Sequence, residues 1–263
     1  MKNGIFFFDF DDTLFSHITK RVSEKTITSL RQLENDGHII IVATGRGREA
    51  IRIIERELGF VPSTVIALNG QIILENGVLV YDNHIDLGSL DRLSDKARQM
   101  DIAYGGYYWD GVIANTVNER VERVWTDWGQ PLPFICSKLE TEYKIYQGQL
   151  YITKEEQTFF DGILEEYITN WSHEYLVNLI PRAAGKSQAV RWCIEKYQIP
   201  HENTFAFGDG FNDVDMIETV CHGVAMGNST SEQLKQKAEY ITAPSHEEGI
   251  YKALTHYKLV SAE

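Results

Sequence analysis

Short apolar runs alternate with amphipathic stretches along the first third of the chain. The runs 5–10 and 38–45 are continuous and rich in Phe, Ile and Val, which is typical of strands buried on both faces. Between and after these runs, 23–37 and 48–59 carry apolar residues at helical spacing and end on a glycine. A third apolar run, 63–70, follows. This alternation predicts an α/β fold with a parallel sheet.

The same alternation returns in the last third of the chain. The stretch 186–199 is amphipathic and stops before a proline, and 204–210 is an apolar run that ends in Gly-Asp-Gly. Further on, 222–228 has the pattern of a short strand and 231–240 that of a helix with one polar face. Together the two regions predict a Rossmann-like core of three layers, in which helices cover both faces of a parallel sheet.

The pattern changes in the middle of the chain. Asn76-Gly77 lies between alternating apolar positions and predicts a hairpin over 71–80. From 82 to 181, tyrosine and tryptophan accumulate among alternating segments such as 144–153. Alternation of this kind is typical of an antiparallel sheet with one face exposed. We therefore expect an inserted α+β unit rather than a continuation of the parallel winding.

Composition and charge narrow the classes of partner. The net charge of −13 disfavours nucleic acid and anionic membrane surfaces as partners. The three cysteines, Cys136, Cys193 and Cys221, are widely spaced and form no CxxC pair, which argues against a disulfide framework and for a reducing compartment. No signal peptide pattern and no apolar run of membrane-spanning length is apparent. A soluble cytoplasmic protein is the expectation.

Three of the predicted strands end in polar residues. In an open parallel sheet, the carboxyl ends of neighbouring strands meet at the crevice where ligands bind. Carboxylates crowded there raise one another's pKa unless a cation compensates them. Mg²⁺, which prefers oxygen ligands and keeps several waters beside a phosphate, fits this requirement. The residues expected to meet are Asp9, Asp11, Thr44, Asp209 and Asp213.

Other polar groups near these strand ends suit a phosphoryl ligand. Thr44 offers a hydroxyl group, and the backbone of Gly45 can approach a phosphate closely. Lys186 opens a predicted helix and supplies a positive charge on a long side chain, and Asn212 can donate from its amide. The set predicts a site that binds a phosphoryl group.

Asp9 and Asp11 suggest phosphoryl transfer through an aspartyl-phosphate. Two residues apart on a strand, they lie on the same side. Asp9 would attack the phosphorus, and Asp11 would protonate the leaving alcohol and then deprotonate the water that hydrolyses the intermediate. The cation would neutralise the charge that develops during transfer.

The ordered motifs "DFDDT", "ATGR", the lysine of "GKSQAV" and "GDGFND" resemble those of the haloacid dehalogenase-like phosphatase superfamily. "LNGQII", the long insert and "LIPRAAGKSQAV" are similar to its Cof-type branch. The resemblance implies that Asp9 is nucleophile and Mg²⁺ ligand and that Asp11 is general acid/base and a ligand through its carbonyl. It implies Asp209 as the other protein ligand, with Asp213 supporting the water shell. The phosphate would be held by Thr44, Gly45, Lys186, Asn212 and the backbone of Phe10.

The position of the insert indicates the type of cap. Only about ten residues separate Thr13 from the first predicted long helix, whereas 140 residues separate Arg46 from Lys186. The core is therefore expected to comprise 1–81 and 182–263, with a cap over 82–181 between the second and third motifs. In the family, such a cap covers the crevice and selects the substrate.

Candidates for substrate selection in the predicted cap are few. Tyr107 and Trp109 belong to an aromatic segment with tandem glycines, 104–111, and Arg182 lies near the return to the core. The roles of two motif residues stay open. Asp12 has no assigned role. Arg46, the last residue of "ATGR", either serves the phosphate site as Thr44 does or simply pairs with a core acid.

With this resemblance, the leading prediction is a Mg²⁺-dependent phosphatase that acts on small phosphorylated metabolites such as sugar phosphates, and three alternatives remain. A phosphomutase shares the aspartyl-phosphate step, but its characteristic cap lies between the first two motifs, where this chain has no room. A receiver-like switch also surrounds Mg²⁺ with acids and a lysine, yet it needs neither a second aspartate nor a cap. A non-catalytic sensor of phosphorylated metabolites on the same fold is the third alternative. The substrate and the oligomeric state are open.

Overall fold

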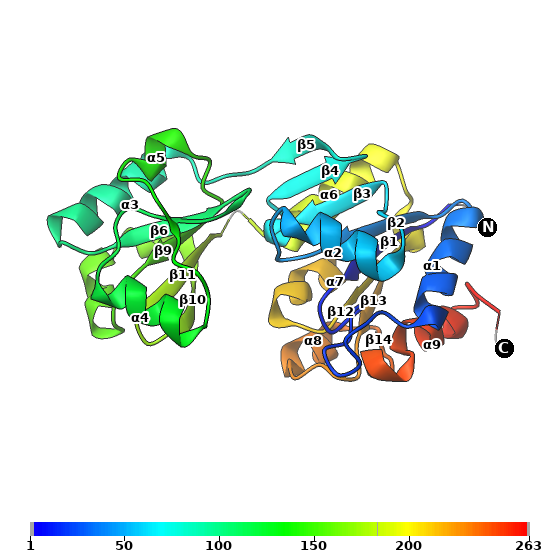
Figure 1. Ribbon diagram of the computed structural model, residues 1–263. Coiled ribbons are helices and arrows are strands. Elements are labelled where there is room, and N and C mark those ends of the chain that lie inside the picture. The colour runs from blue at the N-terminus through cyan, green and yellow to red at the C-terminus, as the bar shows by residue number, and fades with distance from the viewer. Residues whose placement is uncertain (1–2, 183, 262–263) are drawn as a thin grey trace. The chain divides into compact units, whose positions relative to one another are not determined.

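The computed structural model describes residues 3–182 and 184–261, and the chain divides into two compact units. The core unit comprises Met1–Asp82 and Gly185–Glu263, and the insert unit comprises Asn83–Ala184. Figure 1 colours the chain along its length, so the core unit joins the blue and cyan segments to the yellow, orange and red ones. Among the described residues, no helix has both the length and the apolar content that crossing a membrane requires.

An eight-stranded sheet forms the centre of the core unit. The strand order is β14-β13-β12-β1-β2-β3-β4-β5. The strands from β14 to β3 pair in parallel, and β4 and β5 add an antiparallel hairpin at one edge. The strands are β1 (Ile5–Asp9), β2 (Ile39–Ala43), β3 (Thr64–Ala67), β4 (Ile72–Glu75), β5 (Val78–Asp82), β12 (Thr204–Gly208), β13 (His222–Ala225) and β14 (Tyr240–Ile241).

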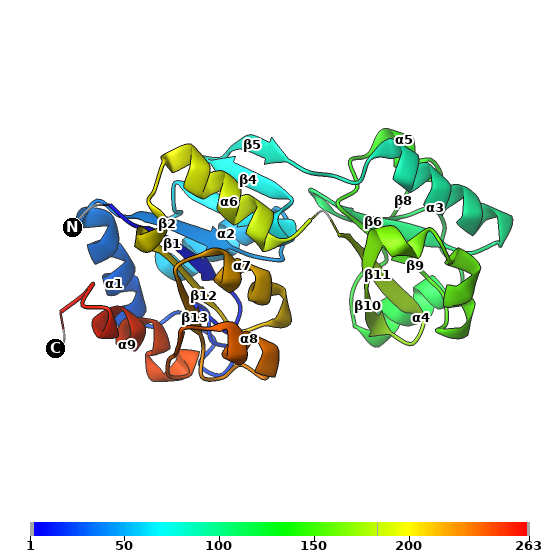
Figure 2. The same cartoon turned by 180° about the vertical axis from the view of Figure 1, so that it is seen from behind.

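Helices cover both faces of this sheet, which gives three layers (Figure 2). Phe6 and Phe8 of β1 pack with α1 (Glu24–Asn35), α2 (Glu49–Leu58) and α9 (Gly249–His256). Ile5 and Phe7 alternate with them and pack on the opposite side. The helices on that side are α6 (Lys186–Tyr197), α7 (Val214–Thr219) and α8 (Glu232–Lys237). The apolar run at the start of the chain is thus a strand buried on both faces.

Local signals set several element ends as expected. The hydroxyl of Ser23 accepts from the backbone N–H of Thr26 and caps α1. Gly59 ends α2 in the left-handed conformation, with φ of 71°. The third predicted strand was wrong at its end, because β3 stops at Ala67 and a turn over Leu68–Gly70 replaces its last three residues.

The insert unit has its own six-stranded sheet, in the order β10-β11-β9-β6-β7-β8. All neighbouring pairs are antiparallel except β7 with β8. This confirms the predicted α/β fold with an inserted α+β unit. The strands are β6 (Tyr104–Tyr108), β7 (Gly111–Ala114), β8 (Phe134–Ile135), β9 (Gln147–Leu150), β10 (Tyr167–His173) and β11 (Leu176–Pro181), and the helices are α3 (Leu87–Gln99), α4 (Glu119–Asp127) and the short α5 (Leu139–Glu142).

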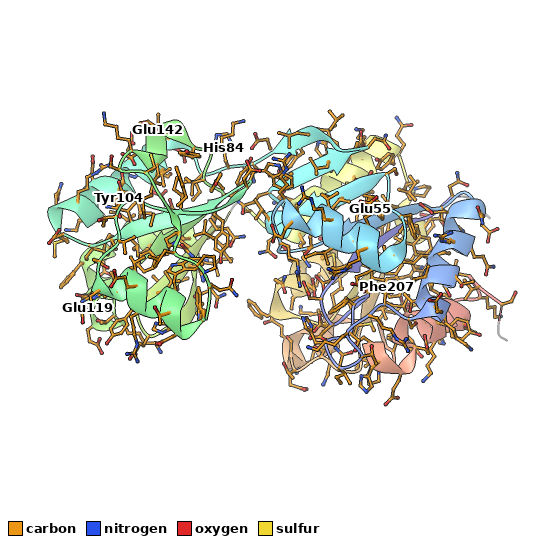
Figure 3. All side chains as sticks on the ribbon, viewed as in Figure 1. Glu55, His84, Tyr104, Glu119, Glu142 and Phe207 are labelled. Carbon is orange, nitrogen blue, oxygen red and sulfur yellow. The ribbon has the colours of Figure 1, made fainter. Side chains whose placement is uncertain are left out.

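Each unit packs around large buried side chains, two of which are labelled in Figure 3. In the core unit, Phe207 of β12 stacks on Phe8 of β1 with 4.6 Å between ring centroids. In the insert unit, Tyr104 of β6 is fully buried, and its hydroxyl donates to Oε2 of Glu140 at 3.2 Å. The two units therefore have separate cores.

Candidate active site

Three neighbouring strands bring the polar motifs to one end of the core sheet. Asp9, the last residue of β1, is in register with Ala43 at the end of β2, so Thr44 follows beside it. On the other side of β1, β12 ends at Gly208, one residue before Asp209. Strand order reverses at β1, which is where open parallel sheets bind ligands. Parallel pairing of strands far apart in sequence thus creates the site.

Lys186 lies at the centre of this group. Its side chain has no exposed surface, although it carries a charge at the first turn of α6. The Nζ atom donates to Oδ1 of Asp9 at 2.5 Å and to Oδ1 of Asp213 at 2.6 Å. Burial disfavours the ammonium, but the two carboxylates outweigh it and raise the pKa of Lys186. The lysine therefore remains charged and holds two carboxylates together.

Asp213 connects Lys186 to the loop after β12. Its Oδ2 atom accepts the backbone N–H groups of Asp209, at 3.0 Å, and Gly210, at 2.9 Å. A Cβ atom at Gly208 would lie 2.4 Å from the Cβ of Asp213, so only glycine leaves room for this side chain. Both oxygens of Asp213 are engaged, which makes it a support for the loop and for Lys186.

Three acids form a cluster that a metal ion fits. Asp9, Asp209 and Asp213 each offer a carboxylate oxygen, and these atoms lie within 4.8 Å of one another. Burial, followed by the charges of Asp213 and Asp12, raises the pKa of Asp209 to about 6. Burial and Asp213 also raise the pKa of Asp9, which Lys186 only partly offsets. Crowded oxygen donors of this kind suit a hard divalent cation such as Mg²⁺.

The carboxylate of Asp11 lies outside this cluster and binds Arg46. Nε of Arg46 donates to Oδ2 at 2.8 Å and Nη2 to Oδ1 at 2.6 Å. The hydrogen bonds to Asp11 contribute most to the raised pKa of Arg46, and the negative charge of Asp11 adds to the effect. A bidentate pair fixes the plane of the carboxylate. Arg46, which the sequence left undecided, is therefore the partner of Asp11.

Asp12, whose role the sequence left open, shapes the turn after β1. It adopts a left-handed backbone conformation, with φ of 55°, and its N–H donates to the carbonyl of Phe15. Its Oδ1 accepts the backbone N–H of His17 at 3.0 Å, and its Oδ2 lies 3.1 Å from Nδ1 of the same residue. Aspartate tolerates this conformation and bonds locally, so a structural role at the turn follows.

The predicted phosphate-binding residues lie in the turns that follow β1, β2 and β12, except Lys186, which begins α6. Thr44 is 1% exposed, and its Oγ1 accepts the backbone N–H of Arg46 at 3.1 Å. Asn212 is exposed and follows β12, in the loop that Asp213 holds. Lys186 is already engaged by two acids. The phosphate-binding role stays a prediction for all three and likewise for Gly45 and the backbone of Phe10.

Three further residues hold the site in place and were not predicted from the sequence. The hydroxyl of Thr13 donates to Oδ1 of Asp209 at 3.3 Å, and that of Ser229 donates to the Asp209 carbonyl at 2.5 Å. Oδ2 of Asp215 accepts the N–H of Ser187 at the start of α6. Thr13 could have been predicted, since it is the last residue of the first motif. Ser229 and Asp215 could not, because each lies far in sequence from the residue that it binds.

The candidates in the insert unit lie on its sheet and at its end. Tyr107 is on β6, Trp109 is in the turn between β6 and β7, and both are partly exposed. Arg182 follows β11, and its Nε donates to the carbonyl of Glu165 at 2.8 Å. Arg182 therefore has a partner within the insert unit. A role in substrate selection stays a prediction for all three.

Comparison with known proteins places the chain in a family. The model of haloacid dehalogenase-like hydrolases matches residues 6–254. YkrA of Bacillus subtilis (strain 168) is 29% identical over 265 residues, which cover 99% of this chain and 100% of YkrA. YcsE of the same organism, a 5-amino-6-(5-phospho-D-ribitylamino)uracil phosphatase, is 27% identical over 95% of this chain and 94% of its own length.

Solved structures agree with this placement. BT1666 from Bacteroides thetaiotaomicron, described among phosphatases of the superfamily, is 26% identical, with a TM-score of 0.85 over 98% of this chain and 96% of its own. The sugar phosphatase BT4131 is also 26% identical, with a TM-score of 0.76 over 98% of this chain and 100% of its own. The predicted fold and the predicted hydrolase class are thereby confirmed. With its acid cluster at the end of β1 and a match along nearly its full length, the chain belongs to the haloacid dehalogenase-like hydrolases.

Proposed function

We propose that the protein is a Mg²⁺-dependent phosphatase that hydrolyses small phosphorylated metabolites, such as sugar phosphates, through an aspartyl-phosphate. The observation that carries the proposal is the buried pair of Asp9 and Lys186 within a cluster of three carboxylates at the end of β1. The phosphatase names of YcsE and BT4131 support the reaction class and a small phosphorylated substrate.

Asp9 is the proposed nucleophile. Lys186 occupies its Oδ1 atom, so we assign the attack to Oδ2, which forms a bond to phosphorus as the bond to the ester oxygen breaks. Asp11 gives its proton to the leaving alcohol and then takes one from the water that attacks the phosphorus. The second step releases inorganic phosphate and regenerates the Asp9 carboxylate.

The acid cluster is the proposed Mg²⁺ site. Asp9 and Asp209 would ligate through carboxylates and Asp11 through its carbonyl, with Asp213 orienting the loop and the water shell. When bound, the cation supplies charge neutralisation for the phosphoryl group in transfer. Lys186, Thr44, Gly45, Asn212 and the backbone of Phe10 would hold the phosphate oxygens.

The insert unit is the proposed cap that selects the leaving group. Its position in sequence, after β5 and before α6, is between the second and third motifs. α1 begins at Glu24, soon after the first motif, which leaves no room for the cap of a phosphomutase there. The cytoplasmic location inferred from the cysteines stays a prediction.

A phosphate-release assay over a panel of metabolite phosphates, with and without Mg²⁺, tests the proposal. The panel includes sugar phosphates, and the variants are Asp9→Asn and, as a matched control, Asp36→Asn on the exposed end of α1. We expect turnover that requires Mg²⁺, is lost in Asp9→Asn and is kept in Asp36→Asn. Turnover that survives Asp9→Asn or needs no metal would overturn the mechanism, and no turnover over the panel would favour a sensor.

A further inference from the structure

The turn after β3 has an unusual backbone. Leu68, Asn69 and Gly70 have φ angles of 49°, 54° and 94°, so all three are in the left-handed region. Two of them carry side chains, and a branched apolar residue such as leucine rarely adopts this conformation. Strained backbone of this kind persists where surrounding contacts fix it, and it concentrates at functional sites.

Backbone hydrogen bonds join this turn to the second motif. The N–H of Leu68 donates to the carbonyl of Arg46, and the N–H of Asn69 donates to the carbonyl of Thr44, both at 3.0 Å. The loop that carries Thr44 and Gly45 therefore runs along the turn. Leu68 and Asn69, which lie more than twenty positions later in the chain, thus fix the position of this loop.

The side chain of Asn69 joins the same loop to the fourth motif. Its Oδ1 accepts Nδ2 of Asn212 at 3.0 Å, across 143 positions of sequence. A Cβ atom built on Gly45 would lie 3.0 Å from the same Oδ1. The carboxamide thus packs against the Gly45 backbone while it binds Asn212.

The third motif also touches this turn. A Cβ atom on Gly70 would lie 2.2 Å from the carbonyl oxygen of Gly185, the residue before Lys186. The turn therefore contacts the loops of the second, third and fourth motifs, each of which holds a proposed phosphate ligand. It is placed to set the distances between them.

We propose that Asn69 is a positioning residue for the phosphate site. It fixes the orientation of the Asn212 carboxamide and the approach of the Gly45 backbone, and it does not itself touch the reacting atoms. Asn212 is exposed, and a second side chain that holds one of its amide hydrogens reduces the orientations it can adopt. Asparagine suits the position because it tolerates left-handed backbone and adds no charge beside a phosphate. This inference rests on the proposed function.

Substitution of Asn69 by glycine separates the side chain from the backbone. Asn69→Gly removes the carboxamide and keeps the left-handed conformation without strain. Asn76→Gly is the matched control, because Asn76 has φ of 49° in the exposed turn between β4 and β5. In the presence of Mg²⁺, calorimetry gives the Kd for inorganic phosphate, kinetics gives KM and kcat, and thermal unfolding reports on stability.

We expect Asn69→Gly to raise both the phosphate Kd and KM about tenfold, with a smaller change in kcat, while Asn76→Gly changes none of them. Asn69→Ala, a second variant that keeps a side chain on the backbone, should give the same loss of affinity. In an Asn212→Ala background, Asn69→Gly should cause a smaller loss than in wild type, because the hydrogen bond between them is already gone and only the contact with Gly45 remains to be lost.

A suppression test uses the contact with Gly45. Gly45→Ala should weaken phosphate binding in the wild-type background, where the new methyl group meets Asn69, and weaken it less in the Asn69→Gly background. A phosphate Kd and KM within about twofold of wild type in Asn69→Gly, with stable folding, would overturn the inference and leave the proposed function standing. Absence of both phosphate binding and turnover in the wild-type protein would overturn the proposed function and this inference with it.

Discussion

The two units bury polar groups in different ways. In the core unit, a fully buried lysine and three crowded acids depend on one another, and both hydrogen bonds of the lysine join segments that are far apart in the chain. The insert unit also buries a charged residue, Glu140, which pairs with Arg98. A separate chain of neutral side chains, most of them buried, crosses its sheet. A substitution is expected to cost more in the charged cluster of the core unit than in this neutral chain.

The neutral chain of the insert unit runs from β10 to α4. Asn178 donates to the hydroxyl of Ser172 at 2.8 Å, and Gln149 donates to Oδ1 of Asn178 at 3.1 Å. The hydroxyl of Tyr151 lies 3.4 Å from Oε1 of Gln149 and accepts Nε1 of Trp125 at 3.0 Å. Loss of one neutral partner leaves a smaller desolvation penalty than loss of a buried charge. We expect the insert unit to tolerate change along this neutral chain better than the core unit tolerates change in its charged cluster.

The largest effect is expected when Lys186 is removed. Lys186→Met leaves Asp9 and Asp213 buried without their cationic partner, so the free energy of unfolding should fall by about 3–5 kcal/mol and turnover should be lost. The matched control is Lys196→Met on the same helix, whose ion pair with Glu75 is partly exposed and should cost less than about 1 kcal/mol. Urea unfolding measures both; equal losses would show that the buried charges do not depend on Lys186.

Removal of Arg46 should affect catalysis more than stability. Its pair with Asp11 is about a third exposed, so Arg46→Ala should change the free energy of unfolding by less than about 1 kcal/mol. We expect kcat to fall about 10- to 100-fold, because the Asp11 carboxylate loses its orientation. Arg46→Lys should not restore it, since lysine cannot form a bidentate pair.

A double-mutant cycle checks this prediction. In an Asp11→Asn background, Arg46→Ala should cause little further loss of kcat, because the two residues act as one unit. Independent effects that multiply would contradict a positioning role for Arg46.

The crowded acids should make the chelated protein less stable at neutral pH. The pKa of Asp209 is about 6 in the folded protein, against an ordinary value of 3.8. A raised carboxyl pKa favours folding while the group is protonated, so its stabilisation is present below pH 3.8 and is lost as the pH rises through 6. With EDTA present, the free energy of unfolding should fall between about pH 4 and 7 in the wild-type protein, and it should fall less in Asp209→Asn. The expected difference between the two proteins is about 1–2 kcal/mol, a value reduced because the Asp209 side chain is partly exposed.

Urea unfolding at pH 4 to 7, in about unit steps, gives the two curves. Addition of Mg²⁺ at pH 7 should raise the stability of the wild-type protein and have less effect on Asp209→Asn. If the free energies of unfolding of the two proteins change in parallel with pH, then burial and the neighbouring acids do not raise the pKa of Asp209.

The smallest effect is expected in the insert unit. Trp109→Ala should change the ratio of kcat/KM between two sugar phosphates of different leaving group by several-fold, a difference typical of one lost apolar contact. The Kd for inorganic phosphate should stay the same, since all the proposed phosphate ligands belong to the core unit. A change in phosphate Kd without a change in selectivity would contradict the proposal that the insert unit selects the leaving group and the core unit holds the phosphate.

The sequence was sufficient to predict that Asp9, Asp209, Asp213 and Lys186 come together, but not that the carboxylate of Asp11 lies outside their cluster. Asp9, Asp209 and Lys186 follow apolar runs or begin a helix, and parallel strands bring their ends together whatever the details of packing. The turn at Asn69 was missed because Leu68 extends an apolar run that reads as a strand, and long-range contacts override that local preference.

The individual hydrogen-bond partners of most side chains could not be predicted across long stretches of sequence. No local pattern indicates that Arg46 pairs with Asp11 or that Ser229 holds the carbonyl of Asp209. These contacts arise only when β2 and β13 take their places in the sheet. The role of Asp12 is local, but it was also missed, because it depends on how the turn after β1 closes on His17.

Mass spectrometry of acid-quenched protein tests the central claim most directly. In Asp11→Asn, a substrate with a good leaving group, such as p-nitrophenyl phosphate, needs no proton from residue 11 for the first step, but hydrolysis of the intermediate lacks its base. We predict one added phosphoryl group on the peptide that contains Asp9, and none in Asp9→Asn. Release of p-nitrophenol with no phosphoryl group on that peptide would contradict the aspartyl-phosphate mechanism.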